Sequence, residues 1–202
     1  MTATGIAQTA DSSASHGLTQ EELEQGRLLL QQTHDVVAGA TRNLSAAQWS
    51  FKPGPDRWSI AENLDHIVTV QERVLGPVLD QLANAPAPPE GFARAAVDSV
   101  VIHHLSSRLK KFQAPEIVRP LGEIQPPELL QRLAANYASL RERLESTPGL
   151  RQHVLPSPPL KAVSQGAYDL MDGYQWILAA AAHTERHAKQ ILEVTACAGY
   201  PA

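Results

Sequence analysis

Two of the eight histidines stand four residues apart, as His183 and His187. If this stretch is helical, side chains at positions i and i+4 are neighbours on one face, with Cβ atoms about 5–6 Å apart. Two imidazoles placed in this way can bind one divalent ion at Zn–N distances of about 2.0–2.1 Å. The spacing therefore predicts part of a metal site, although two ordinary core histidines would show the same spacing.

The residues around this pair place it on the buried face of the predicted helix. At about 100° per residue, His183 and His187 share a face with the apolar Trp176 and Ile191, and Glu185 lies away from it. Buried imidazoles need partners, because an unpaired polar group in a core costs free energy. A metal ion would satisfy both rings, and hydrogen bonds to backbone or water are the alternative.

The third candidate ligand is His66, in a helix predicted to start at Ser59. The same count places His66 roughly 120° from the centre of the apolar stripe of that helix. We therefore expect His66 at the rim of a helical bundle, where solvent and substrate enter. Taken alone, a partly exposed histidine without a ligand role is the simpler explanation of this position.

Four amphipathic helices are predicted to position these histidines. Each shows apolar residues at helical spacing, and two begin with the capping-box pattern, Thr19 with Glu22 and Ser59 with Glu62. The predicted ranges are about 19–44, 59–85, 127–145 and 169–198, and a shorter helix is expected over 95–112.

Segments rich in proline and glycine separate these helices, at 49–58, 113–127 and 150–166. No run alternates between polar and apolar residues for long, so no sheet is predicted. The sequence therefore predicts an all-α fold, a four-helix bundle with one short extra helix. The longer connecting segments leave room for crossover connections.

Composition restricts the partners of the chain. The formal net charge is −4, and the densest basic cluster, Arg108 with Lys110 and Lys111, is too small for a nucleic-acid interface. The longest apolar run, 176–182, is too short to span a bilayer, and residues 1–16 lack the basic and apolar regions of a signal peptide. We expect a cytoplasmic protein without nucleic-acid or membrane partners, with a disordered tail at 1–16 and one domain at 17–202.

The stretch Trp58-Ser-Ile-Ala-Glu62-Asn-Leu-Asp-His66, followed near the C-terminus by His183-x-x-x-His187, resembles the DinB-like superfamily of damage-inducible DinB and YfiT-type proteins. The resemblance covers roughly residues 19–198. It implies a four-helix bundle with a crossover connection and a metal triad of His66, His183 and His187. The implied ion is zinc or nickel, with water completing the shell, and the implied assembly is a homodimer. Glu62 also matches the family pattern, although its place in the capping box is a sufficient explanation.

Characterised relatives in this superfamily include thiol-dependent S-transferases, which use bacillithiol or mycothiol, and a mycothiol-dependent maleylpyruvate isomerase. The resemblance therefore implies a metal-dependent transferase that uses a low-molecular-weight thiol. One alternative is a hydrolase that uses metal-bound water as the nucleophile, and another is a metal-binding stress protein without catalytic activity. No side chain is assigned as catalytic. A di-iron bundle is excluded, because it needs Glu-x-x-His motifs that the sequence lacks.

Several side chains keep open roles at this point. His34 could line the site, although an ordinary core or surface role is the simpler expectation. Three cations in predicted loops could approach the open end of the site: Arg57, Arg151 and Lys161. Arg186 and Tyr174 do not share the face of His183, so no substrate role is assigned to them. A site without basic residues would argue against a bulky anionic thiol.

Overall fold

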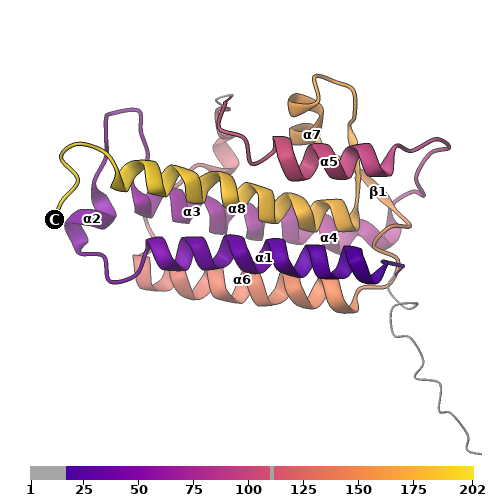
Figure 1. The fold of residues 1–202 in the computed structure, drawn as a ribbon, viewed down its shortest axis with the longest axis horizontal. Coiled ribbons are helices and arrows are strands. Elements are labelled where there is room, and N and C mark those ends of the chain that lie inside the picture. The colour runs from indigo at the N-terminus through magenta and orange to yellow at the C-terminus, as the bar shows by residue number, and fades with distance from the viewer. Residues whose placement is uncertain (1–16, 110–111) are drawn as a thin grey trace, which may run out of the picture.

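Four long helices form the frame of the molecule, α1 (Gln20–Ala40), α3 (Ile60–Val70), α6 (Pro126–Ser146) and α8 (Gly173–Thr195). In this computed structural model, which describes residues 17–109 and 112–202, α1 packs against α6 and α8, and α3 packs against the same two helices. α1 and α3 therefore stand diagonally across the bundle (Figure 1). The predicted all-α class is confirmed, and the predicted crossover connection stays a prediction. The tail predicted at 1–16 lies outside the described residues.

Capping boxes start three of these helices. The Thr19 and Ser59 hydroxyls each accept a hydrogen bond from the backbone N–H of a glutamate three residues later, and that glutamate carboxylate accepts from the capping N–H. Asp172 and Gln175 form the same arrangement at the start of α8. Each box satisfies two backbone N–H groups that the helix leaves without partners. The predicted starts at Thr19 and Ser59 are confirmed.

The helix that carries His66 changes from α-helical to π-helical hydrogen bonding after Val70. α3 continues into a π-helical turn, η2 (Gln71–Leu75), then into α4 (Gly76–Gln81) and a 3₁₀ turn, η3 (Leu82–Asn84). The Gly76 N–H donates to the carbonyl of Gln71, five residues earlier. The wider turn lies directly before Pro77, whose ring would otherwise crowd the carbonyl four residues earlier. The predicted end by Ala85, before Pro86, is confirmed.

The connecting segments hold more structure than predicted. They contain three further helices, a 3₁₀ turn and two antiparallel strands that pair Val154 with Asp172 and Pro156 with Leu170. These elements are α2 (Ala46–Ser50), α5 (Arg94–His104), η4 (Glu116–Val118), β1 (Val154–Pro156), α7 (Pro158–Val163) and β2 (Leu170–Asp172).

Several sequence predictions in these segments were wrong. The connecting segments hold three short helices where one was expected. They also hold a sheet where none was expected, because strands of three residues are too short to show alternation of polar and apolar residues. α8 begins at Gly173 rather than near 169, since 170–172 pair with β1. α5 ends at His104 rather than at 112, and Leu109, which lies beyond this end, is fully exposed.

α8 runs through the core between two apolar clusters. Sixteen of its 23 residues are buried. One cluster includes buried residues of α8 up to Ala181, and the other includes buried residues of α8 from Ala188 onward. Between them lies a polar layer with His183, Thr184 and His187. No described helix has both the length and the apolar character needed to cross a membrane.

Candidate metal centre

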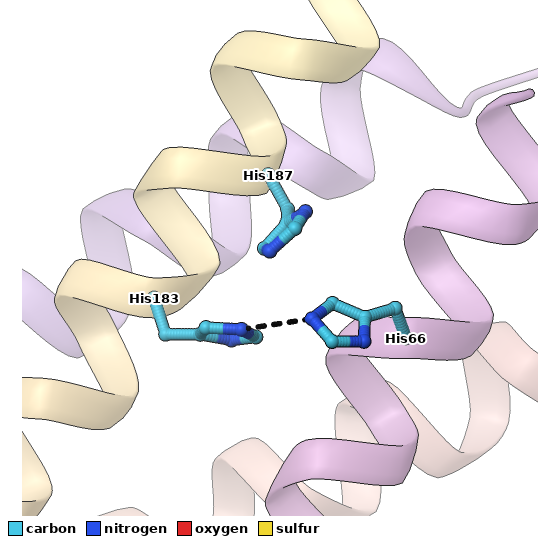
Figure 2. Close-up of side chains that lie close together, drawn as sticks. All are labelled: His66, His183 and His187. Carbon is cyan, nitrogen blue, oxygen red and sulfur yellow. Dashed lines mark hydrogen bonds between the residues drawn. The ribbon is translucent and has the colours of Figure 1, made fainter. Parts of the chain in front are cut away.

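Three histidines meet in this polar layer, His66 from α3 and His183 and His187 from α8 (Figure 2). Their ring centroids are 4.5–5.0 Å apart. The Nε2 atoms of His183 and His66 are 3.2 Å apart, and one ring nitrogen of each residue lies within 4.8 Å of the other two. The sequence prediction that these three residues come together is confirmed by this geometry.

The expected position of His66 at the rim was wrong. Its side chain is 5% exposed, and every residue of α3 from Asn63 to Thr69 is buried. The apolar stripe marks only the face of α3 that packs on other helices. η4 covers a further face of α3, so His66 is buried although it lies away from the stripe. His183 is the partly exposed member of the three.

A backbone carbonyl fixes the orientation of His66. Its Nδ1 lies 2.6 Å from the carbonyl oxygen of Val118, in η4. A carbonyl oxygen only accepts hydrogen bonds, so Nδ1 must carry the proton and donate it. The lone pair is therefore on Nε2, the nitrogen that faces His183.

Asn63 orients His187 in the same way. The Asn63 amide Nδ2 donates to the Ser59 carbonyl at 2.8 Å, so its Oδ1 is the atom that faces Nδ1 of His187, at 3.2 Å. This oxygen only accepts, so Nδ1 of His187 is protonated and Nε2 carries the lone pair. Such contacts orient metal-binding histidines and fix their tautomers.

Asp65 anchors the chain segment that supplies the Val118 carbonyl. Its Oδ2 accepts hydrogen bonds from the backbone N–H groups of Leu121 and Gly122, both at 3.0 Å. Its Oδ1 accepts a third from the Thr69 hydroxyl, at 3.2 Å. The loop that follows η4 is thereby held against α3, and the carbonyl of Val118 stays beside His66.

Trp58 closes one side of the three histidines. Its ring centroid lies 4.8 Å from that of His66 and 5.9 Å from that of His187, with the His187 ring stacked at 23°. An indole in this place keeps water from these two rings. Sequence reasoning assigned no role to Trp58, Asn63 or Asp65, although all three belong to the stretch that ends at His66.

Burial holds the three imidazoles in their neutral form. Desolvation lowers the pKa of His66, lowers that of His183 to about 3, and places that of His187 well below its usual value. Electrostatic repulsion that a protonated ring would meet from the other histidines and from Arg186 adds to the last two shifts. Neutral imidazoles have the lone pairs that a metal ion requires.

These residues fit a divalent ion. Tetrahedral ligands at 2.0–2.1 Å from zinc lie about 3.4 Å apart, and side-chain rotation would bring the three nitrogens from within 4.8 Å to that spacing. The His66 and His183 Nε2 atoms face each other. Since His66 offers a lone pair there, His183 must supply a proton in the metal-free protein. Its Nδ1 is then buried without a hydrogen-bond partner among the described residues.

The remaining candidates lie elsewhere. His34 stacks on Tyr137 of α6, with ring centroids 4.6 Å apart, and does not join the three. Glu62 completes the Ser59 cap and accepts a hydrogen bond from Lys52 at 2.8 Å, which confirms the cap role.

Two of the three loop cations do not approach the histidines. Arg151 is 6% exposed and binds Glu22 and Asp172 at the first turns of α1 and α8, so that expectation was wrong. Lys161 is exposed and lies 4.0 Å from Asp169. Arg57 does reach α8, where it donates to Glu193 at 3.3 Å.

Comparison with known proteins agrees with this geometry. A family model described as the DinB superfamily matches residues 29–191, a range that includes all three histidines. No curated protein and no solved structure matched the chain. By its sequence over this range, the chain belongs to the DinB superfamily.

Proposed function

We propose that the protein binds one divalent ion, zinc or nickel, through Nε2 of His66, His183 and His187, and that it is a metal-dependent thiol S-transferase. Convergence of three neutral imidazoles in a buried layer carries this proposal. Three protein ligands leave a coordination position open, as in catalytic rather than structural sites. A divalent ion would supply Lewis acidity that lowers the pKa of a small thiol and favours its nucleophilic thiolate.

The chain itself prepares the site. The Val118 carbonyl and the Asn63 amide hold two rings with Nε2 inward, so little reorganisation is needed when the ion binds. Trp58 excludes water on the side of His66 and His187. Entry of a substrate is expected beside His183, the most exposed of the three.

The composition of the ligand cluster favours thiol transfer over hydrolysis. Within the described residues, the ligand cluster consists of histidines and includes no carboxylate. Glu62 is engaged by Ser59 and Lys52. A divalent ion would lower the pKa of bound water to about 7, whereas a thiol that coordinates the ion is deprotonated outright. A ligand cluster that holds no carboxylate among the described residues therefore suits the thiol, which needs no general base.

Metal content of protein purified without a histidine tag tests the proposal. We expect close to one equivalent of zinc or nickel in the native protein and in His34→Ala, which removes a histidine outside the trio. His187→Ala should lose the ion, because two ligands bind far more weakly than three. Absence of metal from the native protein, even after zinc or nickel is added, would contradict the proposal.

Activity is then measured on the metal-loaded protein. Consumption of cysteine or another small thiol in the presence of 1-chloro-2,4-dinitrobenzene should depend on the ion and be lost in His187→Ala. Hydrolysis of ester substrates without thiol consumption would instead favour the hydrolase.

A further inference from the structure

A glutamine interrupts the apolar stripe of the helix that carries His66. Ile60, Leu64 and Ile67 repeat at helical spacing on the face of α3 that enters the core, and all three are buried. The next position of this stripe is Gln71, the first residue of the π-helical turn, and it is buried as well. A buried amide costs free energy unless its polar atoms are paired. Packing alone therefore gives no reason for a glutamine at this position.

The amide of Gln71 is only partly satisfied. Its Nε2 donates to the hydroxyl oxygen of Thr184 in α8, at 3.3 Å. That hydroxyl donates its own proton to the carbonyl of Ala180, at 2.9 Å, so it can only accept from Gln71, and the amide is fixed with Nε2 toward Thr184. The other end of the amide, Oε1, is buried and has no hydrogen-bond partner among the residues that the structure describes.

This amide belongs to the same polar layer as the histidines. Thr184 directly follows His183 and precedes His187 by three residues, so the side chains of Thr184 and His187 are neighbours on α8. The hydrogen bond to Thr184 therefore places the Gln71 amide at the turn of α8 that supplies two of the three candidate ligands. The third ligand, His66, lies five residues before Gln71 in the same continuous helix. Turns with π-helical hydrogen bonding often occur at functional sites.

We propose that Oε1 of Gln71 accepts a hydrogen bond from the thiol bound at this site, and that the site selects thiols with a hydroxyl or N–H group close to the sulfur. With the sulfur at the ion, such a group supplies the donor that the described chain does not give to Oε1. The thiol proton passes to solvent when the sulfur binds, and the hydrogen bond to Gln71 breaks no covalent bond. This inference rests on the proposed metal-dependent use of a thiol.

Two thiols of equal size provide the test. The full chain is loaded with cobalt(II), whose visible spectrum reports sulfur binding, and is titrated with 2-mercaptoethanol and with 1-propanethiol, which has a methyl group in place of the hydroxyl. Gln71→Met keeps the length of the side chain and removes the acceptor. We expect it to lower the affinity for 2-mercaptoethanol relative to that for 1-propanethiol about tenfold, or about 1.4 kcal/mol, as loss of one hydrogen bond would give. Gln131→Met makes the same change at an exposed position of α6 and should keep the native ratio.

A purely structural role of Gln71 predicts a different result. If its hydrogen bond to Thr184 only holds the helices together, Gln71→Met lowers the free energy of unfolding of the metal-free protein and leaves the ratio of the two affinities at its native value. An unchanged ratio in the folded variant overturns the inference. If Gln71→Met does not fold, as judged by circular dichroism, Gln71→Asn replaces it, because it keeps an amide in the core and withdraws the oxygen by one carbon atom. The same shift in the ratio is expected.

The outcomes also separate this inference from the proposed function. A cobalt spectrum that responds to both thiols, with the same ratio in the native protein and in Gln71→Met, overturns the role of Gln71 and leaves metal and thiol binding intact. A cobalt spectrum that neither thiol changes overturns thiol binding together with the inference, and leaves the metal centre. No cobalt spectrum at all would overturn all three.

Discussion

The bundle holds two buried polar groups that differ in how completely their atoms are satisfied. At the end where α1 and α8 begin, Arg151 donates to Glu22 at 2.6 Å, to Asp98 at 2.8 Å and to Asp172 at 3.0 Å. Its guanidinium also lies 4.3 Å from the centre of the Tyr174 ring. Every charge in this network has a partner of opposite sign, so it joins α1, α5 and α8 without needing a ligand.

The histidine layer in the middle of α8 shows the opposite pattern. The Nε2 atoms of His66 and His183 face each other at 3.2 Å, and Nδ1 of His183 has no partner among the described residues. Natural cores rarely leave buried polar atoms unpaired. The comparison teaches that a satisfied polar network stabilises the fold, whereas nitrogens whose lone pairs converge mark a place for a ligand that binds lone pairs, such as a metal ion.

Removal of Arg151 should have the largest effect. Arg151→Met leaves Asp172, which is fully buried, with only the longer contact to Arg94 at 3.3 Å, and breaking a buried ion pair on one side costs about 3–5 kcal/mol. Urea unfolding at pH 7 measures the loss. Arg132→Met, which removes a partly exposed arginine, should change stability by less than about 1 kcal/mol. Equal effects of the two variants would show that the network does not hold the helices together.

Acid should destabilise the metal-free protein through the histidines. An unfolded histidine has a pKa of about 6.5, and burial lowers that of His183 in the folded protein to about 3. Between these values the unfolded state binds more protons, so the stability is complete above about pH 6.5 and falls as the pH decreases. Between pH 7 and 5 His183 alone would account for about 2 kcal/mol.

His183→Leu provides the control for this acid effect. In the metal-free protein it should reduce the loss between pH 7 and 5. At pH 7 it should cost little, because loss of the hydrogen bond to Nε2 of His66 is offset by removal of the unpaired Nδ1. Urea unfolding at both pH values measures the difference. An unchanged pH dependence in His183→Leu would assign the acid effect to other groups.

The smallest expected effect is on metal affinity through Asn63. Asn63→Leu keeps the size of the side chain and removes the oxygen that orients His187, so zinc should bind about tenfold more weakly, or about 1.4 kcal/mol. Competition with a chromophoric chelator measures this affinity. Asn136→Leu, an asparagine of α6, should leave it unchanged. Full zinc affinity in Asn63→Leu would show that packing alone orients the ring.

The parts of the fold and site that follow local rules could be predicted from the sequence. Thr19 and Ser59 cap their helices through residues three positions away, and His183 and His187 share a helix face through their spacing. The partners of these histidines could not be found in this way. The Val118 carbonyl comes from a segment 52 residues beyond His66, and backbone carbonyls leave no mark in a sequence.

Arg151 and Arg186 show the same limit for charges. Arg151 appeared as a loop cation free to approach the site, but its partners lie 129, 53 and 21 residues away. Arg186 appeared to lie off the histidine face, yet its charge is among the causes that lower the pKa of His183 and of His187. Long side chains are placed by tertiary contacts rather than by helix periodicity.

The π-helical turn at Gln71–Leu75 separates the helix of His66 into two parts, and the direction in which side chains point is set separately in each part. One additional residue in a turn rotates everything beyond it by about 100°. The face that carries His66 and the face that carries Leu75, Leu79 and Leu82 into the other apolar cluster are therefore set separately. A turn of this kind can arise by insertion of a single residue, so the ligand half of the helix and its packing half could have been selected one after the other.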